Sequence, residues 1–181
     1  PNGERILLHA SNFRKMKRVQ DVVSVFDEVQ KKISSKLLLV GDGPERQHIE
    51  ELGRSLGISD KMTFVGKQEQ MEDIFAIADL FLLTSDYESF GLAALEAMAS
   101  KVPVVSTNAG GLGEVNIEGV TGFMADVGDV KTMSEKSLEI LKDDETLNAF
   151  KERAFHHAQQ FNIDAIIPEY ENIYRRFCKS L

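Results

Sequence analysis

Two glutamates flank a glycine in the segment Glu88-Ser-Phe-Gly-Leu-Ala-Ala-Leu-Glu96. An apolar run before this segment predicts a buried strand, so Gly91 falls where a helix should begin. The first N–H groups of a helix have no partner within it and stabilise an anion such as a diphosphate. A glycine there lets the ligand approach the backbone closely. The segment therefore suits a ligand that carries both phosphates and hydroxyls, as a nucleotide-sugar does.

A more ordinary explanation of the two glutamates stays open on these rules alone. Glu88 would then be a favourable charge before a helix N-terminus, and Glu96 would be a solvated helix residue. Nothing in their spacing brings both carboxylates to one scissile bond, so a glycosidase pair is not predicted.

A basic cluster could supply the positive charge that a phosphate ligand needs. It consists of Arg14, Lys15, Lys17 and Arg18, and it follows the end of a predicted strand. The chain as a whole has a net charge of −8, which argues against general nucleic-acid binding. A charge run taken alone is more often a solvated face, so the cluster depends on the other motifs for its interpretation.

Apolar strands and amphipathic helices alternate along the chain, which predicts an α/β fold with a doubly wound, Rossmann-like parallel sheet. Strands are expected at 6–10, 37–40, 62–65, 79–84, 102–105 and 122–125, and helices at 19–33, 44–56, 71–78, 90–99 and from 130 onward. Ligands of such sheets bind at the carboxyl ends of the strands. The loops expected to form the site are 11–18, 41–44, 65–70, 85–91 and 106–114.

The last predicted helix carries an apolar stripe at helical spacing. Its members are Ile163, Ile166, Ile167, Tyr170, Ile173, Tyr174 and Phe177. One interpretation is that the stripe packs on this domain; the other is that part of it docks on a domain absent from the chain. Pro168 falls inside the stripe and should start a helix or kink one.

The 181 residues are enough for one well-buried domain and short for two. The chain starts with Pro1 rather than methionine, which predicts a fragment of a longer protein. A single cysteine, Cys178, and no visible signal peptide favour the cytoplasm. The longest apolar stretches are far too short to span a bilayer.

Two further features have weaker signals. Gly41-Asp-Gly43 reads mainly as a turn, because Arg46 stands where a dinucleotide fingerprint needs its third glycine. The four histidines show no zinc-type spacing with the cysteine, so no metal site is predicted. His9 ends the first strand and could approach a ligand, although nothing else in the sequence supports this.

The segment from Glu88 to Glu96 resembles the E-x7-E signature of the retaining glycosyltransferases of family 4, which have the two-domain GT-B fold. Further segments resemble the family in the same order, over nearly the whole chain: Ser11-Asn-Phe-Arg-Lys-Met-Lys-Arg18, Leu38-Leu-Val-Gly-Asp-Gly-Pro44, Phe64-Val-Gly66, Ala78-Asp-Leu-Phe-Leu-Leu-Thr-Ser85 and Gly119-Val-Thr-Gly-Phe123. The resemblance implies that residues 1–181 are the donor-binding half of a GT-B fold, with C-terminal helices. The acceptor-binding N-terminal domain would then be absent from the chain.

By position, the resemblance implies a role for each candidate site residue. Glu96 would bind the ribose, and Glu88 would bind hydroxyls of the donor sugar. Arg14 and Lys17 would neutralise the departing diphosphate, with no metal or other cofactor. The remaining donor contacts would be Val65, Gly66 and Lys67 at the base, and Ser89, Phe90, Gly91 and Leu92 along the diphosphate and sugar.

The chain departs from the family pattern in two places. The spacing from Arg14 to Lys17 is shorter than usual in the family, so Arg18 is a rival for the second cation. Gly113 stands where the family usually has proline, which leaves the rigidity of the loop 108–114 and any contact by Glu114 open.

Within the family, Ser11-Asn-Phe-Arg14 followed by Lys17-Arg-Val19 most resembles the transferases that begin bacillithiol biosynthesis. This implies UDP-N-acetylglucosamine as donor and L-malate as acceptor. The alternatives are a transferase of cell-wall or capsular glycan assembly, a non-catalytic nucleotide-sugar-binding module and a UDP-sugar epimerase. The oligomeric state stays open, a homo-oligomer included.

Overall fold

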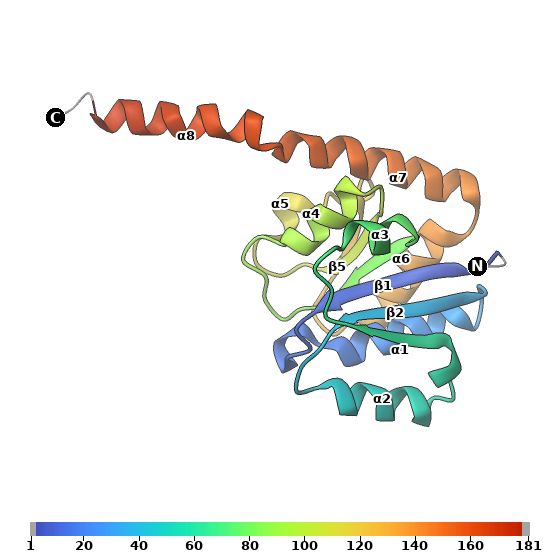
Figure 1. The fold of residues 1–181 in the computed structure, drawn as a ribbon. Helices are drawn as coiled ribbons and strands as arrows, with labels where there is room; N and C mark the ends of the chain where they lie inside the picture. The colour runs from blue at the N-terminus through green and yellow to red at the C-terminus, as the bar shows by residue number, and fades with distance from the viewer. Residues whose placement is uncertain (1–2, 179–181) are drawn as a thin grey trace.

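A computed structural model of the protein describes residues 3–178, and its centre is a parallel sheet of six strands (Figure 1). The strand order β3-β2-β1-β4-β5-β6 is that of the Rossmann fold, as the alternating pattern predicts. Every pair of neighbouring strands is parallel. The strands are β1 (Arg5–Ser11), β2 (Ser35–Gly41), β3 (Met62–Gly66), β4 (Leu80–Leu83), β5 (Val104–Thr107) and β6 (Gly122–Ala125).

Helices cover both faces of the sheet (Figure 1). One face packs against α1 (Val19–Gln30), α2 (Arg46–Ser55) and α6 (Val130–Leu141). The other packs against α3 (Glu72–Ala76), α4 (Leu92–Ala99) and α5 (Leu112–Val115). The long helix α7 (Asp144–Ala158) contributes side chains to both.

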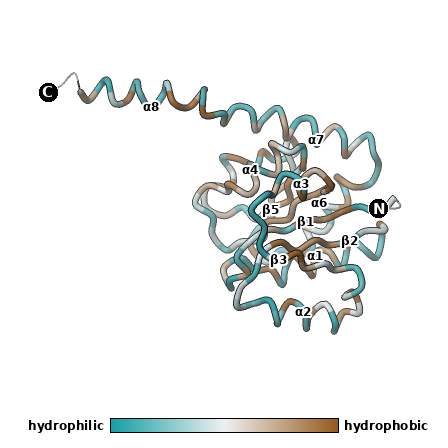
Figure 2. Tube along the Cα trace, in the orientation of Figure 1, coloured by the Kyte–Doolittle hydropathy of each residue, from teal (hydrophilic) through white to brown (hydrophobic). Residues whose placement is uncertain are grey.

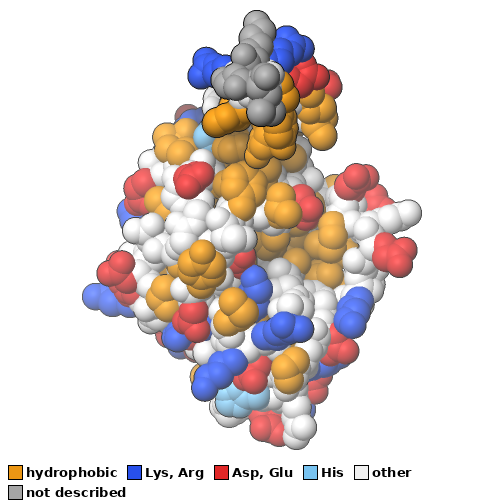
Figure 3. Space-filling view, turned by 90° about the vertical axis from the view of Figure 1, so that its left-hand side faces the viewer, with side chains coloured by type: hydrophobic (Ala, Val, Ile, Leu, Met, Phe, Trp, Pro, Cys, Tyr) orange, Lys and Arg blue, Asp and Glu red, His pale blue; other side chains and the backbone are white. Residues whose placement is uncertain are grey.

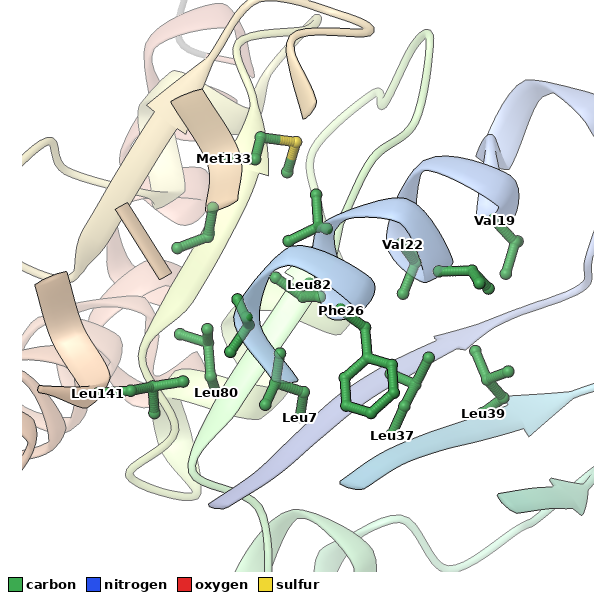
Figure 4. Packing of buried hydrophobic residues seen from close by; sticks show 14 of the residues in the cluster. Leu7, Val19, Val22, Phe26, Leu37, Leu39, Leu80, Leu82, Met133 and Leu141 are labelled. Atoms are coloured by element: carbon green, nitrogen blue, oxygen red, sulfur yellow. The ribbon is translucent and has the colours of Figure 1, made fainter. Parts of the chain in front are cut away.

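The two cores follow from the period of two in the strands. In β1, Leu7 packs in the core under α1, whereas its neighbour Leu8 points to the opposite face. Helix α1 closes the first core with Val22 and Phe26, which are completely buried against strand residues (Figure 4). Burying a side chain of this size stabilises the fold by about 1.5–3 kcal/mol.

The chain reverses its direction across the sheet between β1 and β4. From β1 it proceeds outward to β2 and β3, and it then returns to pair β4 with the other side of β1. Connections leave these two strands in opposite directions, so a crevice opens where their carboxyl ends meet. The loops after Ser11 and Leu83 therefore form the place where a ligand is expected.

Several predicted boundaries move by a few residues. The helix predicted from Phe90 begins at Leu92 with Gly91 as its N-cap, and the helix expected to reach Ile33 ends at Gln30. Pro44 lies in a turn before α2 rather than in its first turn. The element at the basic loop is a short 3-10 helix, Lys15–Lys17, which the sequence did not predict.

The C-terminal helix α8 (Ile163–Cys178) follows the short 3-10 helix Gln159–Phe161 and projects away from the domain (Figures 1 and 2). The interpretation that its apolar stripe packs on this domain is wrong. Tyr174 is 67% exposed and Phe177 is 73% exposed, and the neighbouring stripe residues Ile163, Ile167, Tyr170 and Ile173 are exposed as well. Pro168 lies within α8 and does not start it.

Among residues 3–178, no helix combines the length and the apolar character needed to cross a membrane.

Candidate functional site

A pocket of about 350 Å³ lies at the carboxyl ends of β1 and β4, where the chain reverses direction across the sheet. Figure 3 looks onto this edge of the sheet and shows basic side chains among hydrophobic ones around a hollow surface. The pocket is lined by Ala10, Ser11, Asn12, Lys17 and Leu83, and by the run Glu88, Ser89, Phe90, Gly91, Leu92 and Ala93. The structure thus brings together the basic loop and the first part of the acidic segment.

Lys17 and Glu88 form an ion pair across the pocket, between Nζ and Oε1. Both side chains are largely shielded, with 19% and 16% of their surfaces exposed, so solvent screens the pair less than it would on an open surface. The Ser85 hydroxyl also donates to Glu88 Oε1 at 2.8 Å. The carboxylate is therefore oriented by two donors from two different loops.

The end of β4 holds the basic loop in place through its backbone. The Thr84 hydroxyl is completely buried and lies 2.9 Å from the carbonyl oxygen of Lys17 and 3.0 Å from that of Arg18. The Asp86 N–H donates to the carbonyl oxygen of Met16 at 2.8 Å. These bonds fix where the Lys17 side chain enters the pocket, because they fix the backbone on both sides of it.

Arg18 is directed away from the pocket and into acidic partners of its own. Its Nε lies 2.6 Å from Asp21 Oδ2, and its Nη1 lies 3.4 Å from Asp86 Oδ1. The hydrogen bond to Asp21 raises the pKa of Arg18 above its ordinary value. Of the two rivals for the second cation, the geometry favours Lys17.

The other two basic residues lie at the rim. Arg14 and Lys15 are exposed, and neither lines the pocket. Arg14 has no ion-pair partner among residues 3–178, so its guanidinium is available to a ligand that extends out of the pocket.

His9 is buried directly beneath the pocket. Its ring stacks near Phe13 and Phe81, with centroids 6.2 and 6.4 Å away. Burial lowers the pKa of His9 to about 4, and the Leu82 carbonyl that accepts from it acts in the opposite direction. The imidazole is consequently neutral at pH 7.

Glycines let the loops around the pocket pack backbone to backbone. A Cβ on Gly110 would lie 1.9 Å from the carbonyl oxygen of Glu88, and one on Gly43 would lie 2.0 Å from that of Asn12. Gly110 also has a positive φ of 60°. The loops 41–44 and 106–114, predicted to form the site, thus support the two loops that line the pocket.

The N-terminus of α4 forms one wall of the pocket. Gly91 is its N-cap with a φ of 95°. The Ala94 N–H donates to the Gly91 carbonyl oxygen, whereas the N–H groups of Leu92 and Ala93 begin the helix and have no acceptor within it. They offer positive partial charge to an anion in the pocket. A side chain at Gly91 would also meet Leu112, since a Cβ there would lie 2.6 Å from its Cδ2.

Glu96 does not reach this pocket. It is exposed on α4 and borders a second pocket of about 960 Å³, together with residues 69–73 from the loop after β3 and the start of α3. Val65 and Gly66 end β3 close to that loop and are half-buried, and Lys67 is exposed. The two glutamates of the opening segment therefore line different pockets.

Three polar residues of the site lie in loops that were expected to form it, but sequence reasoning assigned none of them a role. Ser11 and Asn12 line the pocket, and Ser85 holds Glu88. All three follow directly on a predicted strand, so their position at carboxyl ends was a usable signal. The neighbours that the sequence did single out are charged or belong to the segment Glu88–Glu96, and these three residues are neither.

The remaining sequence candidates lie elsewhere. Glu114 is exposed on α5, and a Cβ at Gly113 would make only an ordinary contact with Asn108 Oδ1 at 3.9 Å, so the loop does not require glycine there. Within residues 3–178, no group of three or more His, Cys, Asp or Glu side chains is placed to hold a metal ion.

Comparison with known proteins identifies the family of the chain. Residues 1–157 match the model of the family described as Glycosyl transferases group 1. The chain is 46% identical over 173 residues to N-acetyl-alpha-D-glucosaminyl L-malate synthase of Bacillus anthracis, covering 95% of this chain and 45% of the relative. It is 36% identical over 138 residues to a D-inositol 3-phosphate glycosyltransferase of Corynebacterium urealyticum, covering 75% and 32%.

Solved structures share the fold. Sucrose-phosphate synthase from Thermosynechococcus elongatus superposes with a TM-score of 0.90 at 29% identity, covering all of this chain and 47% of that one. Anabaena HepE in complex with UDP and glucose superposes with a TM-score of 0.88 at 23% identity, covering 96% and 49%. The chain therefore spans less than half the length of each of these relatives.

Proposed function

Because the chain belongs to the group 1 glycosyl transferases, we propose that it is the donor-binding half of a retaining, GT-B-fold enzyme. The proposed reaction transfers N-acetylglucosamine from UDP-N-acetylglucosamine to L-malate, the first step of bacillithiol biosynthesis. The chain is 46% identical to a protein named N-acetyl-alpha-D-glucosaminyl L-malate synthase, and this supports both the proposed donor sugar and the proposed acceptor. The other half of the enzyme would hold the acceptor, and the reaction would take place in the cytoplasm.

The observation that carries the proposal is the combination of opposite charges in one pocket. Lys17 and the first N–H groups of α4 lie where a diphosphate would need stabilisation, and Glu88 lies among them as an acceptor for sugar hydroxyls. When the sugar departs from UDP, negative charge grows on the diphosphate. Donors that already point at that charge lower the barrier because they need no reorganisation.

The Lys17–Glu88 ion pair gives the pocket its resting state. A diphosphate would compete with Glu88 for the Lys17 ammonium, and Glu88 would then be free to accept hydrogen bonds from the sugar. Ser85 would keep the carboxylate in position during this exchange, because its hydroxyl bond does not involve Lys17. Arg14, from the rim, would add a second positive charge on the diphosphate.

The second pocket would take the nucleoside end of the donor. Glu96 borders it, and a carboxylate suits the hydroxyls of a ribose. The end of β3, with Val65 and Gly66, and the exposed Lys67 that follows it would border the base. Ser89 and the backbone of Phe90, Gly91 and Leu92 would lie along the diphosphate and the sugar between the two pockets.

The test is a transfer assay on the intact protein with UDP-N-acetylglucosamine and L-malate. We expect N-acetylglucosaminyl malate with the anomeric configuration retained, whereas the 181-residue chain alone should bind UDP and transfer little or no sugar. Robust turnover by the chain alone would contradict the assignment of the acceptor site to the other half. Transfer to a lipid or glycan but not to L-malate would replace this function by glycan assembly, and UDP-sugar binding without any transfer would indicate a binding module.

A further inference from the structure

We propose that Ser11 is a hydrogen-bond acceptor for the sugar of the donor, and that buried His9 is the positioning residue that fixes this polarity. Neither residue has a role in the function proposed above. The inference rests on that function for the identity of the ligand. It adds which group in the pocket bonds the sugar, and that this group accepts a hydrogen bond and does not donate one.

The tautomer of His9 follows from its partners. Nδ1 lies 2.8 Å from the carbonyl oxygen of Leu82, which can only accept, so Nδ1 carries the proton. The ring is completely buried and neutral, so Nε2 has a lone pair and no proton. Nε2 lies 2.8 Å from the Ser11 hydroxyl, which must therefore donate to it.

Because its proton is donated to His9, the Ser11 hydroxyl can only accept further hydrogen bonds. A serine hydroxyl has one proton and two lone pairs. The proton goes to His9 Nε2, and one lone pair accepts the Phe13 N–H at 3.3 Å. The second lone pair has no donor among residues 3–178, and Ser11 lines the pocket beside Lys17 and Glu88.

The pocket is thereby divided into an accepting and a donating part. Ser11 Oγ and the Glu88 carboxylate accept, whereas the Lys17 ammonium and the N–H groups at the start of α4 donate. A diphosphate can only accept, so it is repelled from Ser11 and is bound by the donating part. Sugar hydroxyls and an acetamido N–H can donate, so the sugar end of the ligand is the part that matches Ser11.

The rotation of a serine hydroxyl is ordinarily free, and free rotation would make Ser11 indifferent to the ligand group opposite. His9 removes that freedom. Its ring stacks near those of Phe13 and Phe81 and is anchored to the sheet through the Leu82 carbonyl, which holds Nε2 toward Ser11. The selectivity of the pocket for a donating sugar group is therefore set by a residue that the ligand never touches.

The first experiment compares UDP with UDP-N-acetylglucosamine on the intact protein by calorimetry. Ser11→Ala should weaken binding of the sugar nucleotide by about three- to tenfold, the range for one neutral hydrogen bond, and leave UDP affinity unchanged. Ser24→Ala is the matched control, because that hydroxyl bonds the Gln20 carbonyl on α1, away from the pocket. Equal losses for both ligands, or no loss for either, would overturn the role of Ser11.

The second experiment tests the polarity. UDP-sugars in which a single sugar hydroxyl is replaced by fluorine keep their size but cannot donate at that position. One such analogue should bind the wild-type protein several-fold more weakly than its parent, and this difference should vanish in Ser11→Ala. If every fluorinated analogue binds the wild-type protein as tightly as its parent, and removal of the parent's acetamido group also leaves the affinity unchanged, Ser11 accepts no hydrogen bond from the sugar.

The third experiment addresses His9. His9→Phe keeps an aromatic ring between Phe13 and Phe81 but frees the Ser11 proton to turn into the pocket. Discrimination against the fluorinated analogue should fall, while UDP affinity should stay at its wild-type value. Discrimination that survives in a folded His9→Phe protein would show that His9 does not set the polarity. Failure of the wild-type protein to bind UDP would overturn the proposed function itself, and the wild-type control reveals that separately.

Discussion

Side chains are paired in one region of the molecule and left exposed in another. The first region is the pocket at the ends of β1 and β4, and the second is the projecting helix α8. In the pocket, polar groups that lie far apart in the sequence find partners in β1 and in the two loops that follow β1 and β4. Lys17 pairs with Glu88, Thr84 bonds the backbone of the basic loop, and His9 bonds Ser11. In α8, an apolar stripe of regular spacing finds no cover, and Tyr174 stays 67% exposed.

This difference teaches which part of the chain is complete in itself. Buried polar groups are costly unless they are paired, so the pairing of Lys17, Thr84 and His9 within the domain indicates that the domain alone determines their geometry. Exposed apolar side chains at helical spacing bring no stability to this domain. Substitutions in the two regions should therefore have very different consequences, and four experiments rank them.

The largest effect is expected for Gly110→Ala. A Cβ at this position would lie 1.9 Å from the Glu88 carbonyl oxygen, and the φ of 60° is unfavourable for alanine, so the loops must separate. We expect a loss of about 3 kcal/mol in the free energy of unfolding, measured in urea, together with a loss of UDP binding. Gly119→Ala is the control: its φ is 71° but a Cβ meets nothing within 4 Å, so it should cost only about 1 kcal/mol. Equal losses for the two variants would mean that the close approach of the loops is unimportant.

The second effect is a pH dependence of stability that originates at His9. Burial lowers its pKa to about 4, the Leu82 hydrogen bond opposes this shift, and the charges of Lys17 and Glu88 act in opposite directions. Between pH 7 and 5 the unfolded chain gains a proton at this histidine, whose ordinary pKa is about 6.5, while the folded state does not. The free energy of unfolding should therefore fall by about 2 kcal/mol from this residue as the pH drops.

His9→Phe should remove the part of the pH dependence of unfolding free energy that comes from His9. Unfolding curves recorded at pH 7 and at pH 5 will measure this change. The control is His48→Gln on the exposed surface of α2, which leaves His9 in place and should keep the wild-type slope. If His9→Phe shows the full wild-type slope, the pH dependence arises at other groups.

The third effect concerns the cation in the pocket. Lys17→Met should weaken UDP binding about tenfold or more, because it removes the ammonium that would neutralise the diphosphate. It should also reduce the dependence of UDP affinity on salt, since contacts between a cation and a phosphate at a partly exposed site are screened. Lys15→Met, in the same short helix but exposed at the rim, should change the affinity less than twofold. Similar losses in both variants would point to the general charge of the loop and not to Lys17.

The sheet was predictable because its strands are short apolar runs, and these runs alternate along the chain with amphipathic helices and turn residues. The parallel arrangement predicted for the strands also placed the basic loop and Glu88 at the same edge of the sheet, where the carboxyl ends of the strands lie. The choice between Lys17 and Arg18 was not predictable, because it depends on the left-handed backbone at Arg18, which turns that side chain toward Asp21 and Asp86.

Two other features were not predictable because they also depend on the three-dimensional surroundings of a residue. A lone histidine in a strand gives no sign of whether it faces a pocket or a core, and the Leu82 carbonyl that fixes the tautomer of His9 is a backbone group. The stripe on α8 showed that one face of the helix is apolar, but periodicity does not say which surface covers that face.

The smallest effect is expected on α8, and it is the sharpest test of the comparison. Tyr174→Ser removes a large exposed ring without a large change in helix propensity, so the 181-residue chain should lose less than about 0.5 kcal/mol of unfolding free energy. Phe26→Ala in the first core is the reference and should cost about 3–5 kcal/mol. A loss above about 1 kcal/mol for Tyr174→Ser would mean that the stripe packs on this domain after all. If the same substitution is neutral in the chain but costly in the intact protein, the cover of α8 is supplied by the rest of that protein.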